Sequence, residues 1–286
     1  MKAKKKIRLS GCLLLTSLSL AFFSCQATEP LTEVCVETES RLASGTRPVV
    51  ELVRQGDQEA YFTLARMYND GDGVPQSNLN ALILYGIHYR HCGPASRPYT
   101  DLFPSDHPFY PFARLVFEGR GKHPYSESIA LMEDSCPIEH AALLTFMELD
   151  NGADPCAILT RLKELEDDGS ELGAVFRLFY HQSRGDMDSF EQIVKEKAGQ
   201  YPLFHSLLAE VYEARYAQRP DIAYLYNALE HYRLSDMEGM LTHGFARKYL
   251  RLYSQLEKLT GVHPDPDEVA RLKRVFTASA PFSFEN

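Results

Sequence analysis

The 286-residue sequence contains none of the short motifs that mark the common catalytic sites. It has no G-x-S-x-G elbow, no serine followed three positions later by lysine, no H-E-x-x-H helix, no Walker loop and no dinucleotide fingerprint. These absences disfavour the hydrolases, penicillin-interacting enzymes, zinc proteases and nucleotide-binding enzymes that depend on such motifs. We therefore predict no catalytic residue, no metal site and no cofactor.

Long hydrophobic runs are scarce as well, and the clearest one lies near the amino terminus. Residues 13–23 form an uncharged stretch of 11 residues, which is too short to cross a bilayer of about 30 Å as a helix. The stretch follows a segment with five basic residues, and this layout predicts an export signal over residues 1–24. Its removal leaves no expected transmembrane span.

The end of this signal, with Ser24 directly before Cys25, resembles the lipobox of bacterial lipoproteins. The resemblance implies that Cys25 carries diacylglycerol and palmitate and becomes the new amino terminus. The phenylalanine three positions before the cysteine departs from the usual leucine, and plain secretion after cleavage at Ala27 is the alternative. Gln26, where aspartate would favour the inner membrane, implies an outer-membrane protein that faces the periplasm or the exterior.

Basic residues are in the minority once the signal is removed. The remaining 262 residues hold 25 Lys plus Arg against 39 Asp plus Glu, a formal net charge of −14. Such a chain repels nucleic acid and anionic lipid headgroups, so neither is an expected partner. Membrane attachment is expected through the acyl chains alone.

Cysteine is also sparse, and no C-x-x-C spacing occurs, which disfavours a thiol redox site or a structural zinc. Cys35, Cys92, Cys136 and Cys156 remain in an oxidising compartment, where three pairings are open. A Cys92–Cys136 disulfide is the first of these to consider. The alternative is that both are unpaired, small apolar residues.

What the chain does contain is an internal repeat. Residues 64–73 (LARMYNDGDG) recur 48 positions later as residues 112–121 (FARLVFEGRG). Asp57 is a suitable N-cap for the helix that precedes the first Gly-x-Gly, and Ser77 is a suitable cap for the next one. A repeated helix end with its turn predicts stacked helical hairpins.

These residues resemble the Sel-one-like repeat, a relative of the tetratricopeptide repeat. The clearest repeats span residues 57–91 and 111–135. The matching positions are Ala60, Leu64, Ala65, Tyr68, Gly71, Gly73, Val74, Ala81 and Tyr85 in the first repeat and Ala113, Gly119 and Gly121 in the second. The resemblance implies a right-handed α-solenoid that binds protein or peptide.

A proline-rich insert, residues 92–111, separates the two repeats and carries Tyr99, Phe103, Phe109 and Tyr110. Such insertions lie in loops of a solenoid. Loop aromatics either clamp a ligand or pack onto the helix ends, and packing is the commoner outcome.

The later sequence keeps a helical rhythm without a clear repeat. Gly152, Gly185 and Gln218 mark turns that are 33 residues apart, and no segment alternates like a β-strand. Helices are expected at 48–55, 138–149, 172–181, 187–197, 203–216, 223–234 and 237–259, with further helices starting at Asp154-Pro155 and Asp265-Pro266.

Three arginines are candidates for partner binding. Arg66 and Arg114 occupy equivalent repeat positions, and Arg177 holds a similar place in a later helix. A ladder of such side chains suits the carboxylates of a peptide, but stems that cover apolar neighbours are the commoner use. The acidic run 166–168 reads as solvated, and His88 and His91 read as packed or surface residues.

We therefore predict an all-α, right-handed solenoid of about six hairpins over residues 48–286, joined by a tether of residues 25–47 to a lipidated Cys25. The expected function is to bind protein or peptide partners as a scaffold, adaptor or host-contact factor, of unknown oligomeric state. The alternatives are an envelope hydrolase on the same scaffold and a secreted, host-directed interaction protein.

Overall fold

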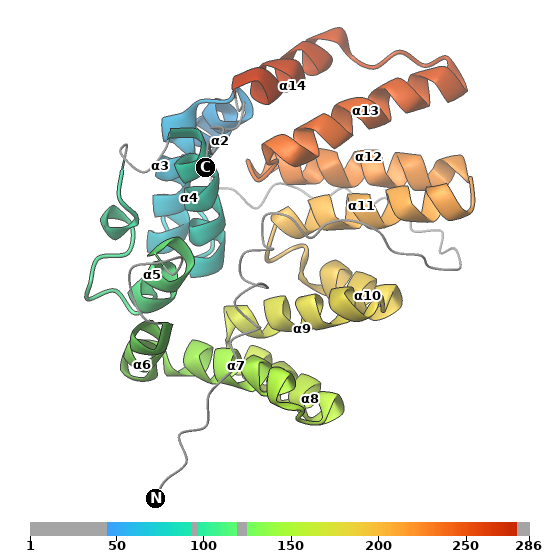
Figure 1. Ribbon diagram of the computed structural model, residues 1–286. Coiled ribbons are helices and arrows are strands. Elements are labelled where there is room, and N and C mark those ends of the chain that lie inside the picture. Colours follow the sequence, from blue (N-terminus) through green and yellow to red (C-terminus); the bar gives the residue numbers. More distant parts are fainter. Residues whose placement is uncertain (1–44, 93–96, 119–124, 279–286) are drawn as a thin grey trace, which may run out of the picture. The chain divides into compact units, whose positions relative to one another are not determined.

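The structure, a computed structural model, describes residues 45–92, 97–118 and 125–278 (Figure 1). Within these ranges thirteen α-helices and two short 3-10 helices account for all regular structure, and no strand occurs. The predicted all-α class is confirmed. The signal segment, Cys25, Cys35 and residues 26–44 of the tether lie outside the described residues.

The chain folds into two compact units, and in each unit the helices pack mainly on their neighbours in the sequence. Among the described residues, the smaller unit lies within 106–179, and the larger unit combines residues from 45 to 105 with those from 180 to 278. The smaller unit contains α5 (Tyr110–Glu118), α6 (Tyr125–Ser135), α7 (Pro137–Met147), η3 (Glu148–Asn151), α8 (Pro155–Asp167) and most of α9 (Glu171–Arg184).

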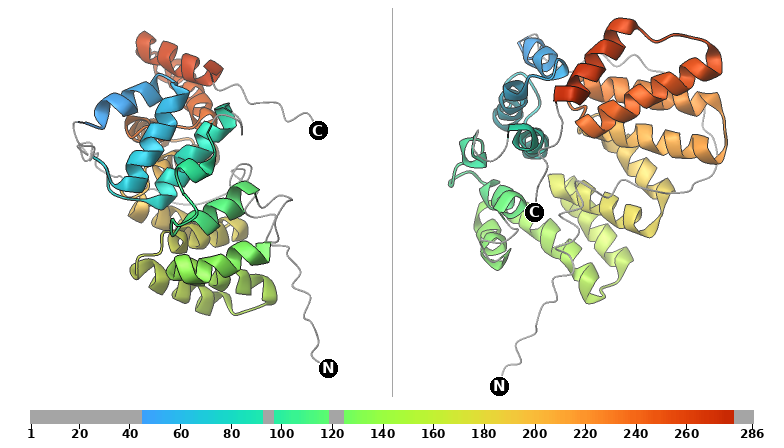
Figure 2. Two further views of the ribbon diagram at one scale, coloured as in Figure 1. Left: turned by 90° about the vertical axis from the view of Figure 1, so that its left-hand side faces the viewer. Right: turned by 45° about the horizontal axis from the view of Figure 1, so that its top comes forward.

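The larger unit begins and ends with helices that contact each other. Its elements are α2 (Arg47–Arg54), α3 (Gln58–Asp70), α4 (Asn78–Cys92), η2 (Tyr99–Asp101), α10 (Met187–Lys197), α11 (Leu203–Gln218), α12 (Ile222–Met237), α13 (His243–Thr260) and α14 (Pro266–Ala278). Helices α11 and α12 lie side by side in all views of Figures 1 and 2. Helix α2 also packs on α12, a contact between distant segments that neighbour-to-neighbour stacking does not predict.

The α3–α4 hairpin forms as its sequence predicts. The Asp57 carboxylate accepts hydrogen bonds from the backbone N–H groups of Glu59 and Ala60, and Ser77 Oγ accepts one from Asn80 N–H. Gly71 ends α3 at φ 71°, in the left-handed region. The predicted apolar positions Ala60, Leu64, Ala65, Tyr68, Val74, Ala81 and Tyr85 are all buried.

The second repeat also forms a helical hairpin, in which α5 packs on α6. Ala113 is buried, while Gly119 and Gly121 lie outside the described residues. Tyr99, Phe103 and Phe109 of the insert are buried as well, so these rings pack into the fold and do not form an open clamp.

A helix is present over most of the predicted range 237–259, but its predicted start is wrong by six residues. Helix α12 ends at Met237, Gly239 adopts φ 72°, and α13 begins at His243. A Cβ atom at Gly239 would lie 3.0 Å from Leu64 Cδ2 and 3.4 Å from Val53 Cγ1. The turn therefore packs closely against α2 and α3, which leave little room for a side chain at residue 239.

A close helix crossing in the smaller unit leads to a prediction. A Cβ atom on Gly173 of α9 would lie 2.8 Å from the carbonyl oxygen of Leu162 on α8 and 3.1 Å from Glu166 N. We expect Gly173→Ala to lower the free energy of unfolding by about 1–3 kcal/mol, because the crossing must open. Gly86→Ala on α4, where no atom lies within 4 Å of the new Cβ, should instead raise it by about 0.5–1 kcal/mol. Urea unfolding measures both, and stabilisation by both variants would contradict the crossing.

Candidate interaction site

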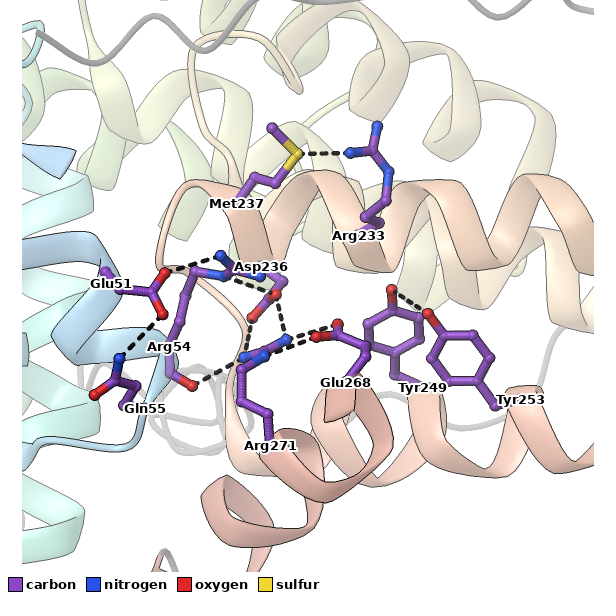
Figure 3. Close-up of polar contacts among 10 residues, drawn as sticks. All are labelled: Glu51, Arg54, Gln55, Arg233, Asp236, Met237, Tyr249, Tyr253, Glu268 and Arg271. Carbon is purple, nitrogen blue, oxygen red and sulfur yellow. Dashed lines mark hydrogen bonds and ion pairs between the residues drawn. The ribbon is translucent and has the colours of Figure 1, made fainter. Parts of the chain in front are cut away.

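A buried ion-pair network joins α2, α12 and α14 (Figure 3). Arg271 Nη2 and Nη1 donate to the Asp236 carboxylate at 2.6 and 3.2 Å, and Arg54 Nε donates to it at 3.1 Å. Arg271 also donates to the backbone oxygen of Arg54 at 2.9 Å and pairs with Glu268. The side chains of Asp236 and Arg271 are only 4% and 9% exposed. We call this set of residues the Asp236–Arg271 network. Its role is structural, because neither Asp236 nor Arg271 presents a polar group to solvent that could contact a ligand.

Burial raises the pKa of Asp236, while the guanidinium groups of Arg271 and Arg54 act in the opposite direction. The hydrogen bonds to Glu268 and Asp236 raise the pKa of Arg271 against the effect of its burial. Because the Asp236 carboxylate is buried and engaged by two arginines, a substrate cannot reach it for general acid–base chemistry.

The three predicted arginines do not share one environment. Arg114 and Arg177 lie in the smaller unit with side chains 12% and 15% exposed, whereas Arg66 is exposed on α3 of the larger unit. Arg114 pairs with Glu118 and Glu127 at 3.5 Å each, and Arg177 pairs with Glu166 at 2.5 Å. Arg114 and Arg177 are therefore engaged within the fold.

The acidic run 166–168 is not wholly solvated, contrary to the sequence interpretation. The Glu166 side chain is 3% exposed because it lies against Arg177 and Lys163. No local feature of the sequence indicates this burial, because the partner Arg177 belongs to the next helix. Asp167 and Asp168 are exposed, as predicted.

The histidines offer no metal centre among the described residues, where no group of three or more His, Cys, Asp or Glu side chains converges. His88 is fully buried, and its Nδ1 lies 2.9 Å from the backbone oxygen of Gln58. It is thus a packed histidine. The side chain of His91 lies outside the described residues. His205 and His231 do meet, with their Nδ1 atoms 3.1 Å apart.

The two described thiols, Cys136 and Cys156, are free. Burial raises the pKa of the Cys136 thiol to about 11, which makes it a poor nucleophile at neutral pH. The side chain of Cys92 lies outside the described residues, so the Cys92–Cys136 disulfide stays a prediction.

The exposed face of α13 is the surface that sequence reasoning missed. Arg247, Arg251, Ser254 and Lys258 are all exposed there, and their spacing of four, three and four residues places them on one side of the helix. The opposite side is buried. We call this set the α13 ridge. The signal is present in the sequence, because Arg247, Arg251 and Lys258 recur at helical spacing within the helix expected there.

Comparison with family models, with curated proteins and with solved structures gives no match. The described part of the chain includes no helix that combines the length and the apolar character needed to cross a membrane.

Proposed function

We propose that this chain is an exported, lipid-anchored solenoid of helical repeats that binds protein or peptide partners. The α3–α4 hairpin supports the proposal, because its caps, its glycine turn and its buried positions match those of the Sel-one-like repeat. The packing of α5 on α6, of α7 on α8, of α11 on α12 and of α13 on α14 is the pairing expected of further repeats.

The observation that carries the proposal is how the buried charges of the described residues are used. Three ion pairs whose two side chains are both at most 15% exposed join one helix to another: Asp236–Arg271, Glu166–Arg177 and Glu191–Arg215. Glu139 of α7 has a similar use, since its carboxylate accepts hydrogen bonds from Ser170 Oγ and from two backbone N–H groups at the start of α9. These groups build a scaffold, and the exposed surface is left for recognition.

Binding can be tested by site-specific photocrosslinking of the full chain in cells. A benzophenone amino acid at Ser254 on α13, or at Arg66 on α3, is expected to yield discrete adducts of defined mass that contain a second polypeptide. The same amino acid at Val262, in the exposed loop after α13, serves as the control for nonspecific capture. Absence of adducts at both helical positions would count against a polypeptide-binding function.

The anchor is tested separately by intact-protein mass spectrometry. The wild-type protein should begin at Cys25 and carry the mass of acyl chains, and Cys25→Ser should lack that mass and leave the membrane fraction. If the wild-type protein instead begins directly after Ala27 and carries no acyl mass, it is secreted and has no lipid anchor.

A further inference from the structure

The α13 ridge has a length and a regularity that suit recognition of an extended charged segment. Arg247 and Lys258 are eleven residues apart, which is about 16 Å along an α-helix. Arg251 lies between them with a side chain that is 63% exposed. The ridge therefore presents three cations in a row in a chain of net charge −9.

The carboxylates around the ridge neutralise it only in part. Glu213 of α11 pairs with Arg251, and Glu210 of α11 pairs with Lys248 at the edge of the ridge. Glu257, the single acidic residue of α13, is bound by His263 at 2.6 Å. Among the described residues Arg247 and Lys258 form no ion pair, so the ridge keeps an excess of positive charge.

Lys248 lies at the edge of the ridge, where its charge interacts with that of Arg251. Burial, and after it the nearby Arg251, lower the pKa of Lys248 to about 8. Like charges that are held this close repel each other, and an anionic partner relieves that repulsion.

Helix stability accounts for only part of the ridge: Lys258 lies in the last turn of α13, where the helix dipole favours a cation, but Arg247 and Arg251 do not. The first turn of α13 holds no acidic residue, and Arg247 and Lys248 follow directly after it, where the helix dipole does not favour cations. The cations that do stabilise the fold behave differently. Arg114, Arg177 and Arg271 are all largely buried against carboxylates.

We propose that Arg247, Arg251 and Lys258 on the exposed face of α13 bind an acidic segment of a partner polypeptide. This inference rests on the proposed polypeptide-binding function and names its surface and the chemistry of its partner. Glutamates at helical spacing on a partner helix match the ridge, and guanidinium groups bind carboxylates through paired hydrogen bonds. Nucleic acids and anionic bilayers fit less well, because the acidic remainder of the chain repels extended polyanions.

The test is a fluorescence anisotropy titration of the full-length protein with a labelled peptide whose glutamates recur at the spacing of the ridge. We expect Arg247→Glu/Lys258→Glu to weaken binding about tenfold or more, since two exposed ion pairs become repulsive. Arg47→Glu/Arg219→Glu is the matched control, because it reverses the same number of exposed charges elsewhere and should leave the affinity within about twofold. Thermal melting of both variants verifies that each is folded.

Other outcomes overturn the assignment. Equal weakening by both double variants would mean that only net charge matters, and no binding by the wild type would remove the ridge as an acidic-peptide site. Ridge-dependent binding to vesicles of anionic lipid or to DNA, without peptide binding, would assign the surface to a different partner. Discrete photocrosslinks at Arg66 together with any of these results would leave the general binding function intact while rejecting the ridge.

Discussion

Asp236→Ala is expected to destabilise the protein by about 3–5 kcal/mol, because it leaves Arg271 and Arg54 without their shared carboxylate inside the fold. Removing one partner of a buried ion pair is costly, since the remaining charge has lost both water and its counter-ion. The measurement is the free energy of unfolding from urea denaturation followed by circular dichroism, with the slope checked for a single transition.

Two further variants distinguish the contribution of the buried Asp236–Arg271 network to stability from that of an exposed ion pair. Glu230 lies on the same helix and pairs with Arg233, whose side chain is 48% exposed, so Glu230→Ala should cost less than about 1 kcal/mol. The double variant Asp236→Leu/Arg271→Met removes both buried charges and should recover much of the lost stability. If Asp236→Ala costs no more than Glu230→Ala, the three helices are not held together by this network.

The helix ends were predictable because the residues that determine them are neighbours in the sequence. Asp57, Asp154 and Asp265 each accept a hydrogen bond from a backbone N–H within the following turn, as their positions before helices predict. The glycine that ends α3 needs a left-handed backbone, and this requirement is local as well.

A break between α12 and α13 was predicted, but its position, between Met237 and His243, could not be predicted in the same way. Periodicity continues through this segment, and Gly239 is one glycine within it. The decisive contact is with Val53 and Leu64, which are far away in the sequence. Only the tertiary packing of α2 and α3 shows that residue 239 has little room for a side chain.

The Asp236–Arg271 network was not predicted from the sequence for a related reason. Asp236 lies near the end of α12 among residues of mixed polarity, as an exposed residue also could. Its partners Arg271 and Arg54 are 35 and 182 residues away. A charge at a helix end has no local feature that distinguishes burial from exposure. The α13 ridge differs, since its cations lie on one helix and their spacing is visible in the sequence.

The second prediction with a large expected effect concerns the pH dependence of stability that arises from the His205–His231 pair. The ring centroids are 5.3 Å apart, the ring planes differ by 18° and the Nδ1 atoms are 3.1 Å apart, so the two imidazoles lie nearly in one plane and point toward each other. In this hydrogen bond, the Nδ1–H group of one ring donates to the unprotonated Nδ1 atom of the other. Protonation of both Nδ1 atoms would place two N–H groups against each other, and Tyr212, which stacks on His231, limits movement of that ring.

The free energy of unfolding is therefore expected to fall by up to about 3 kcal/mol between pH 6.5 and pH 4 through His231 alone. Burial, aided by His205 and by Lys195 of α10, lowers the pKa of His231 to about 4, while Glu230 acts in the opposite direction. Because the folded state holds this imidazole neutral, its contribution is complete above the unfolded-state pKa of about 6.5 and is lost as protons bind preferentially to the unfolded chain. Burial also raises the pKa of the carboxylates Glu139 and Asp236, so the quantity to measure is the difference between wild type and His231→Gln at each pH. That difference should shrink steadily as the pH falls, and a difference that stays constant from pH 7 to pH 4 would show that His231 is not held neutral by its surroundings.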